Sequence, residues 1–177
     1  MTDDAPFTLA DRDFTFCSLQ PSQAGILQPL FEQCADYIWL VEGHEVSPDA
    51  ARQTFEEVPP GHPLDHKFVY GILNRAGEII GVLEGMRHYP EKDVWWIGLL
   101  LLAPSARSQG LGRKVIAAFA DFVQAQGGTA LMLGVVEENQ AAYRFWQGQG
   151  FALVRTTEPR TFGKKTQRVL VMRRGLD

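Results

Sequence analysis

The chain has 177 residues, of which 45% are hydrophobic, and its formal net charge is -4. A chain of this length can bury one good core and leaves little room for a second domain, so we expect a single domain over residues 1–177. No apolar run reaches the roughly 18 residues of a membrane span. No transmembrane helix is therefore expected. Because the first residues are acidic, a signal peptide with a basic start is not expected either.

Cysteine usage and charge narrow the class of protein further. The two cysteines, Cys17 and Cys34, have no CxxC spacing, which favours a reduced, cytoplasmic protein. Residues 1–93 carry 6 basic and 16 acidic side chains, a charge of -10, whereas residues 94–177 carry 11 and 5, a charge of +6. This division suits a polyanionic ligand on the C-terminal half and a cationic ligand near the N-terminal half. It equally suits two differently solvated faces, and the net charge argues against a nucleic-acid partner.

The first half of the chain reads as one strand, two helices and a meander of strands. Residues 13–19 alternate like a half-buried strand, and residues 22–43 have apolar residues at helical spacing that Pro29 would bend or break. Residues 47–58 form a second helix, with Ser47 as its cap. Three antiparallel strands are then predicted over residues 67–74, 79–89 and 94–103.

The second half alternates helices and strands. The predicted elements are helix 111–126, strand 129–136, helix 139–149 and the strands 151–157 and 167–174. Together the elements predict an α+β fold with a mostly antiparallel central sheet flanked by helices. A strand–loop–helix–strand unit lies in its middle.

The loop before helix 111–126 has the pattern RxxGxG, from Arg107 to Gly112. Consecutive backbone N–H groups and the helix dipole converge there, so the loop predicts an anion site. A dinucleotide loop would need a third glycine where Val115 stands. A GxxxxGK[ST] loop would need a glycine upstream of the GKKT segment at 163–166, which is missing.

This loop and the segment 139–151 together resemble the GNAT superfamily of acetyl-CoA-dependent N-acetyltransferases, over roughly residues 67–155. In that family the Pro-x-x-Arg-x-x-Gly-x-Gly segment, here from Pro104 to Gly112, binds the pyrophosphate of coenzyme A through backbone N–H groups. The resemblance implies the acyl-CoA N-acyltransferase fold and acetyl-CoA as the cofactor. It places the cofactor-binding core at about 94–155 and the acceptor-side helices at about 22–58.

The second motif departs from the family at one position. The family pattern Asn-x-x-Ala-x-x-x-Tyr maps onto Asn139, Ala142 and Trp146, so a tryptophan stands where a tyrosine is thought to serve the departing thiolate. An indole N–H donates a hydrogen bond but is no useful acid. Tyr143, roughly 60° around the helix from Trp146, is a candidate replacement. Packing, or a contact with the cofactor, is the alternative role for Tyr143, and water could serve as the acid.

The resemblance also assigns the end of the leucine-rich strand to the cofactor, through the main chain of Leu100 and Leu102. Gly98, in the middle of this strand, allows a bulge, a close approach of a ligand or a packing accommodation. The full set of predicted cofactor-binding residues is Leu100, Leu102, Arg107, Ser108, Gln109, Gly110, Leu111, Gly112, Asn139, Ala142 and Trp146.

A general base is harder to assign, because strand 94–102 has no carboxylate where the family often keeps a glutamate. Glu84, flanked by apolar residues and glycines, is the best candidate, since such surroundings raise the pKa of a carboxyl group. His88 is the rival, and either residue could instead bind substrate. His62 and His66 have the spacing of a metal helix, but the prolines around them indicate a loop, so no metal site is expected.

The acceptor is expected where the first helices overhang the sheet. Acidic and aromatic residues gather there and suit a small cation: Asp36, Tyr37, Trp39, Glu42, His44 and Glu45. The basic segment 160–167 could close over this cleft.

These observations predict a cytoplasmic N-acetyltransferase that transfers the acetyl group of acetyl-CoA to a primary amine of a small molecule or peptide. Direct attack in a ternary complex is expected, because neither cysteine lies near the motif residues. A non-catalytic acyl-CoA sensor is the alternative, which the missing tyrosine and the missing strand glutamate favour. No motif fixes the acceptor, and a homodimer is left open.

Overall fold

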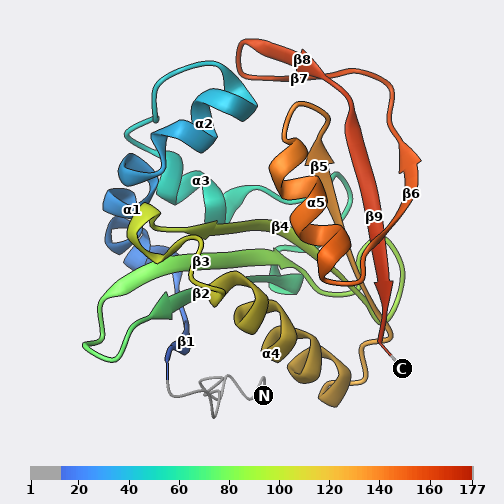
Figure 1. Ribbon diagram of the computed structural model, residues 1–177, viewed down its shortest axis with the longest axis horizontal. Helices are drawn as coiled ribbons and strands as arrows, with labels where there is room; N and C mark the ends of the chain where they lie inside the picture. Colours follow the sequence, from blue (N-terminus) through green and yellow to red (C-terminus); the bar gives the residue numbers. More distant parts are fainter. Residues whose placement is uncertain (1–12, 177) are drawn as a thin grey trace.

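The computed structural model describes residues 13–176 and shows a seven-stranded sheet with helices on both faces (Figure 1). The strand order is β1-β2-β3-β4-β5-β9-β6, and β4 pairs with β5 in parallel while the other neighbours are antiparallel. The strands are β1 (Thr15–Ser18), β2 (Lys67–Leu73), β3 (Ile79–Met86), β4 (Val94–Leu102), β5 (Ala130–Val136), β6 (Ala152–Thr156) and β9 (Val169–Gly175). The predicted α+β class is confirmed. The acidic start of the chain lies outside the described residues.

The predicted helix over residues 22–43 is three short helices. They are the 3-10 helix η1 (Pro21–Ile26), α1 (Gln28–Gln33) and α2 (Ala35–Glu42). The predicted break at Pro29 is present: η1 ends at Ile26, and Pro29 lies in the first turn of α1, where its missing N–H leaves no bond unmade. The next helix, α3 (Ala50–Glu56), starts after Asp49, so the prediction of Ser47 as its cap is wrong.

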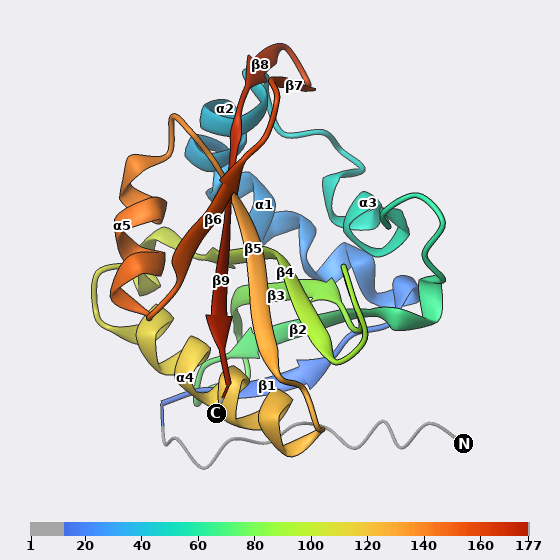
Figure 2. The same cartoon turned by 90° about the vertical axis from the view of Figure 1, so that its right-hand side faces the viewer.

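The two faces of the sheet carry separate cores. Helices α4 (Leu111–Ala125) and α5 (Gln140–Gly148) cover one face, where Phe119 and Trp146 pack with buried strand residues such as Leu83. The helices from η1 to α3 cover the other face (Figure 2). Each helix packs its apolar side chains against the sheet and leaves its polar side chains in solvent, as is typical of a surface helix. The two helical layers are thereby fixed on opposite sides of the central strands.

A two-stranded hairpin, β7 (Arg160–Phe162) and β8 (Lys165–Gln167), lies in the connection between β6 and β9. It stands at the top of Figure 1, above α2. The sequence analysis predicted only a basic segment here, because strands of 3 residues with mostly exposed side chains show no apolar alternation. Short 3-10 turns, η2 (Leu64–His66) and η3 (Pro104–Ala106), precede β2 and the loop of Arg107. None of the helices in residues 13–176 has the length and apolar character to cross a bilayer.

Candidate active site

The parallel strands β4 and β5 pair over only part of their length. Their partners run from Val94–Ala130 to Ile97–Leu133, and beyond Ile97 the two strands diverge. The gap is a slot of about 160 Å³, lined by residues of β4 and β5 together with Asn139, Ala142 and Trp146 beside and on α5. A slot between splayed strands exposes main-chain N–H and C=O groups that no neighbouring strand satisfies, so a ligand can bind to them.

The main chain of Leu100 faces this slot. Ala103 N–H donates to Ile80 on the β3 side at 2.9 Å, and alternate residues of a strand point their polar groups to opposite sides. Leu100 and Leu102 therefore turn their main chains away from β3. The carbonyl of Leu102 is already engaged, because it accepts from Arg107 Nε at 2.9 Å and from Cys34 Sγ at 3.4 Å. Leu100 offers the free main-chain groups.

The loop between β4 and α4 forms a cradle of free N–H groups. From Ser108 to Arg113 no backbone N–H donates to another residue of the described chain. Ser108 and Gly110 have φ values of +61° and +79°, and such alternation turns successive N–H groups toward one point. Together with the positive end of α4, a helix of 15 residues, the loop has the chemistry of an anion site. The RxxGxG loop therefore carries free N–H donors, and the binding of an anion there stays a prediction.

The side chain of Arg107 turns away from this cradle. Its Nη atoms form a two-pronged ion pair with Asp36 of α2, at 2.6 and 3.2 Å. The guanidinium lowers the pKa of the Asp36 carboxyl below its ordinary value. Gln109 also turns back, donating to Ser105 O at 2.7 Å. The N–H of Arg107 is also engaged, because it donates to Pro104 O at 3.3 Å, so the free N–H groups from Ser108 to Arg113 are the donors that the cradle offers a ligand.

The segment before α5 brings Asn139 to the slot. Its Oδ1 accepts from Ala142 N–H at 3.0 Å, so Asn139 caps α5 while lining the slot. Trp146 is buried and lines the slot as well, against the rings of Phe145 and Phe151. Tyr143 packs on the core under α5 and lines neither this slot nor the larger cavity described next.

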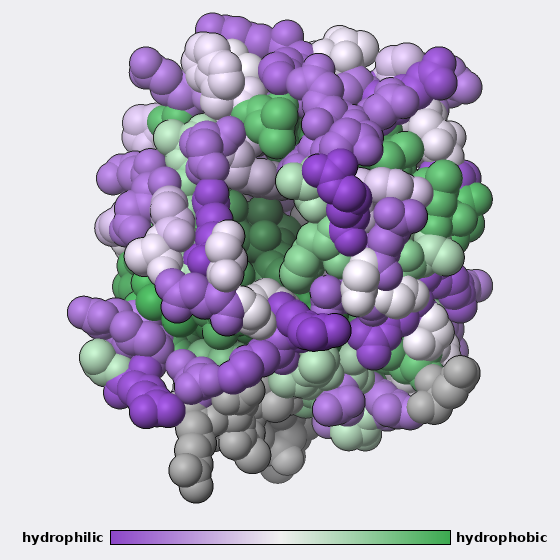
Figure 3. Space-filling model, in the orientation of Figure 1, coloured by the Kyte–Doolittle hydropathy of each residue, from purple (hydrophilic) through white to green (hydrophobic). Residues whose placement is uncertain are grey.

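A larger cavity of about 800 Å³ adjoins the slot. Four residues line both spaces: Tyr37, Val41, Gly98 and Leu99. Figure 3 shows the surface hollowed between α2 and α5, with hydrophobic residues at the bottom of the hollow and polar residues around it. The two spaces therefore meet at the middle of β4, on the face of the sheet toward α2.

Glu84 lies at the floor of the larger cavity and is buried. Its Oε2 accepts from Lys67 Nζ at 2.5 Å, and Lys67 also donates to Glu57 O. Burial raises the pKa of Glu84, and the ammonium of Lys67 opposes this shift without cancelling it. A carboxyl group held in this way can exchange a proton with a ligand in the cavity.

Gly98 makes room for this carboxylate. Glu84 pairs with Leu99 and Gly85 with Ile97, so Gly98 is the extra residue of a β-bulge in β4. A Cβ at Gly98 would stand 1.9 Å from Glu84 Oε1. Of the three roles considered for Gly98, the bulge and the accommodation of a packed group are both present.

The rival base, His88, lies elsewhere. β3 ends at Met86, so His88 sits in the following turn with a φ of +56° and not within the strand predicted over residues 79–89. It lines neither cavity, and its Nδ1 accepts from Asp93 N–H at 3.2 Å. Its ring contacts that of His66. Within residues 13–176, no three or more His, Cys, Asp or Glu side chains are grouped to hold a metal ion.

The sequence analysis placed Tyr37 only among the residues of a general acceptor wall. The structure places it where slot and cavity meet. Burial, followed by the charges of Glu42 and Glu84, raises its pKa to about 12. Its face could not be read from the sequence, because the helical phase is reset at the break between α1 and α2, at Cys34.

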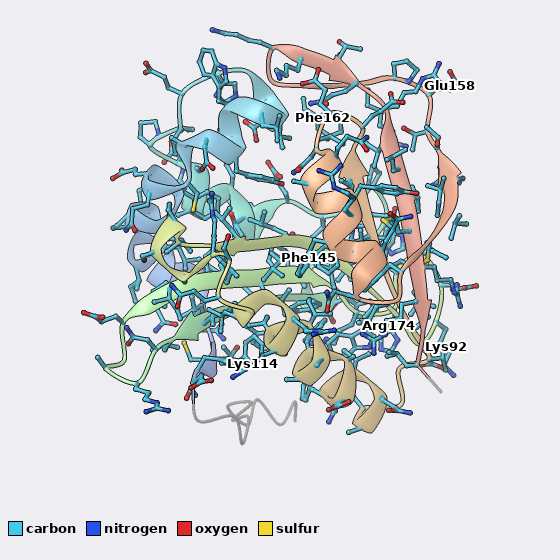
Figure 4. All side chains as sticks on the ribbon, viewed as in Figure 1. Lys92, Lys114, Phe145, Glu158, Phe162 and Arg174 are labelled. Atoms are coloured by element: carbon cyan, nitrogen blue, oxygen red, sulfur yellow. The ribbon has the colours of Figure 1, made fainter. Side chains whose placement is uncertain are left out.

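The hairpin β7–β8 closes the upper side of the larger cavity with Arg160 and Phe162, and Figure 4 shows Phe162 below the hairpin at the end of α2. Main-chain and side-chain donors tie the hairpin to the C-terminal carbonyls of α2. Lys164 N–H donates to Glu42 O at 2.7 Å, Lys165 Nζ donates to Leu40 O, and Gln167 Nε2 donates to both Leu40 O and Val41 O. The basic segment thus closes over the cleft, as the sequence analysis expected.

Comparison with known proteins agrees with this geometry. A family model described as the acetyltransferase (GNAT) family matches residues 27–151. No curated protein matches the sequence.

Solved structures resemble the whole fold. An acetyltransferase from Thermus thermophilus has a TM-score of 0.75 at 23% identity, over 93% of this chain and 97% of that one. A spermidine N-acetyltransferase from Vibrio cholerae, in complex with CoA and spermine, has a TM-score of 0.71 at 16% identity, over 94% and 97%. The ribosomal-protein-S18-alanine N-acetyltransferase from Escherichia coli has a TM-score of 0.67 at 16% identity, over 93% and 94%. At these identities the likeness shows a shared fold.

Proposed function

Because the chain belongs to the acetyltransferase (GNAT) family, we propose that it transfers the acetyl group of acetyl-CoA to a primary amine in a ternary complex. The observation that carries the proposal is the meeting of two spaces at Gly98 and Leu99. The slot between β4 and β5 suits a narrow pantetheine arm, and the larger cavity suits an amine. A donor and an acceptor can then meet without a covalent enzyme intermediate. Contrary to the expectation from the sequence, Cys34 lies beside the motif residues, since its Sγ donates to Leu102 O, but neither cysteine lines either space.

The residues present fit acetyl-CoA. The cradle from Ser108 to Arg113 offers consecutive N–H groups for the pyrophosphate, and Leu100 and Asn139 lie along the slot. The cofactor supplies an activated acetyl group as a thioester. The N–H of Leu100 is directed to hold the carbonyl oxygen, where negative charge develops.

Glu84 is the general base of this proposal. The amine nitrogen bonds to the acetyl carbon, and the carbon–sulfur bond breaks with its electron pair on sulfur. The proton that the nitrogen loses passes to the Glu84 carboxylate and reaches the thiolate by way of solvent. Lys67 keeps the carboxylate in place, and Gly98 leaves it the space that it occupies.

The lining of the larger cavity supports a primary amine with an apolar body. Aromatic side chains contribute much of the wall: Phe31, Tyr37, Tyr89, Trp96 and Phe162. Glu42 and Glu57 add negative charge, which attracts an ammonium group before it loses its proton. The two free thiols, Cys17 and Cys34, support a cytoplasmic location.

The proposal predicts that acetyl-CoA stabilises the protein and that an amine releases free thiol from it. At 100 times its dissociation constant, a ligand adds about 2.7 kcal/mol to the free energy of unfolding. For a chain of this size the melting temperature then rises by about 5 to 10 °C. Thiol release is followed in the same samples against amino acids, polyamines, aminoglycosides and short peptides.

A matched pair of variants tests the cradle. Ser108→Asp places a negative charge beside the pyrophosphate site and should weaken acetyl-CoA binding by about tenfold or more, measured by calorimetry. Ser108→Asn has nearly the same shape, tolerates the positive φ equally and should bind like the wild type. Equal affinities in the two variants would remove the cradle from the proposal, and binding without thiol release from any amine would favour the sensor.

A further inference from the structure

Tyr37 occupies the position where the acetyl donor and the amine must meet. It belongs to α2, which lies opposite α5 (Figure 1) across the hollow of Figure 3, and it is one of the four residues that line both the slot and the larger cavity. We infer that the Tyr37 hydroxyl donates a hydrogen bond to the carbonyl oxygen of the acetyl thioester during transfer. The inference rests on the proposed function and adds a second donor to the N–H of Leu100.

The hydroxyl of Tyr37 is free to do this. The residue is half-buried, and its hydroxyl forms no hydrogen bond within residues 13–176. The enclosed side-chain atoms without a partner in this part of the chain are His66 Nδ1 and Gln167 Oε1, so the Tyr37 oxygen is not sealed off. A hydroxyl that has no hydrogen-bond partner and faces a ligand space can donate a hydrogen bond to a bound ligand.

Few other side chains can supply such a donor at the slot. Among its lining residues, Tyr37, Asn139 and Trp146 carry side-chain donors. Trp146 and Asn139 line the slot alone, whereas Tyr37 also lines the larger cavity. The Asn139 side chain is held at the start of α5, where its Oδ1 accepts from Ala142 N–H. Tyr143 packs against the core, away from both spaces. Tyr37 is the hydroxyl that also faces the amine side.

The role is that of a hydrogen-bond donor and not of an acid. The pKa of Tyr37 is raised to about 12, by burial and then by Glu42 and Glu84, so the phenol stays neutral at every working pH. An ordinary thiol has a pKa of about 8.5, so such a phenol does not give its proton to a thiolate. It still stabilises charge that develops on an oxygen, as neutral donors do in an oxyanion hole.

The helix that carries Tyr37 is fixed next to β4. The neighbouring Asp36 pairs with Arg107, and Cys34 Sγ donates to Leu102 O. Both contacts reach the end of β4 or the loop that follows it. The distance between Tyr37 and the main chain of Leu100 is therefore set by contacts outside the cavity, which is the preorganisation that a fixed donor requires.

The test is Tyr37→Phe, which removes the hydroxyl and leaves the ring. We expect kcat for thiol release to fall by about 100-fold, the loss typical of one such donor, with the KM for acetyl-CoA nearly unchanged. Between pH 6 and 9.5 the shape of the kcat profile should not change, because a neutral donor does not titrate there. Tyr70→Phe is the matched control, because Tyr70 packs on the core and lines neither space, and it should keep kcat within threefold.

A second readout does not depend on turnover. The infrared band of the carbonyl in bound, 13C-labelled acetyl-CoA should lie at lower frequency in the wild type than in Tyr37→Phe, since a hydrogen bond weakens the C=O bond. An unchanged band and an unchanged kcat in a folded Tyr37→Phe protein would overturn the inference alone. Absence of thiol release from the wild type would instead overturn the proposed function. Loss of an alkaline limb in the variant would show that Tyr37 is an acid and would also overturn the inference.

Discussion

Gly85 of β3 and Gly98 of β4 lie next to the β-bulge, and each leaves room for a different neighbouring group. A Cβ at Gly85 would stand 1.9 Å from the main-chain oxygen of Trp96, which cannot move without separating the strands. A Cβ at Gly98 would meet the end of the Glu84 side chain, which can rotate away. Gly85 is therefore needed for the sheet itself, whereas Gly98 is needed for the position of a carboxylate.

Gly98→Ala should lower activity far more than it lowers stability. The new methyl group displaces Glu84 from its place beside Lys67, and overpacking of this kind costs about 1–3 kcal/mol. The displaced group is the proposed base, and a general base typically contributes a factor of about 10² or more to the rate. Partial loss of this contribution should lower kcat for thiol release at least tenfold. Chemical denaturation and the thiol assay measure the two effects.

Gly148→Ala is the matched control, because a Cβ there meets nothing within 4 Å. It lies at the end of α5, where alanine is no worse than glycine, so stability should hold or rise slightly. Full kcat in a folded Gly98→Ala protein would mean that the Glu84 carboxylate works equally well elsewhere, or is not the base.

Single residues differ in how far the sequence could predict them. Glu84 stands out as a lone acid in an apolar strand, and the cradle glycines stand out because the RxxGxG pattern is followed by the second motif at 139–151. Tyr37 and Lys67 do not stand out. Their importance comes from contacts between elements distant in the chain, which composition and spacing cannot show.

At the scale of elements, α2 is held at both ends by other parts of the chain. The Asp36–Arg107 pair and the Cys34 contact hold its start, and the hairpin β7–β8 binds the carbonyls at its end. A helix of 8 residues is too short to be stable alone, so these contacts decide where it lies.

Asp36→Ala should disturb the site with little loss of stability. The pair is partly exposed, with 33% of the Arg107 and 63% of the Asp36 side chain accessible, and exposed pairs contribute about 0.2–1 kcal/mol. We expect kcat to fall several-fold, because Tyr37 is the next residue along α2, while acetyl-CoA affinity is retained. Glu56→Gln, which breaks the exposed Arg52–Glu56 pair on α3, is the control.

The Asp36–Arg107 ion pair makes the free energy of unfolding depend on pH, and the sign of this dependence follows from the shift of the Asp36 pKa. Arg107 lowers the Asp36 pKa below 3.8, so between the two values the unfolded chain binds more protons than the folded one. The pair stabilises the fold fully above the ordinary pKa, and the contribution disappears as the pH falls through the lower, folded pKa. The difference in unfolding free energy between wild type and Asp36→Ala should thus be constant from pH 5 to 8 and shrink below about pH 4. A constant difference down to pH 2 would show that the ion pair is not its source.

Elements with a strong pattern were predictable, and those with a weak pattern were not. Strand β4 and helices α4 and α5 lie within a residue or two of their predicted bounds, because long apolar periodicities specify them. The hairpin β7–β8 and the breaks before α1 and α2 depend on contacts with distant residues, which local propensity does not encode.

At the scale of the whole molecule, the proposed cofactor side and the proposed acceptor side are built from different segments. The slot is lined mostly by β4, β5 and α5, whereas the hairpin contributes only to the larger cavity. The basic C-terminal half of the chain does not line the slot alone, because Arg160 of this half lines the larger cavity.

Phe162→Ala should therefore change the use of the amine and leave the use of the cofactor intact. Removing this ring opens the wall of the larger cavity, so the KM for an amine with an apolar body should rise several-fold, while the dissociation constant for acetyl-CoA stays the same. Leu153→Ala, an exposed position on β6 outside both spaces, is the control and should change neither. A parallel loss of acetyl-CoA affinity in Phe162→Ala would show that the two sides are not separable.

The hairpin β7–β8 also bears on how such a protein can diversify. It is inserted between two neighbouring antiparallel strands, β6 and β9, whose pairing does not depend on the length of what joins them. Exchange of this single connection, by natural insertion or in the laboratory, would replace one wall of the larger cavity and keep the slot and the cradle proposed to bind acetyl-CoA. A library of loops grafted between Thr157 and Arg168 is accordingly the most economical route to enzymes with new amine preferences.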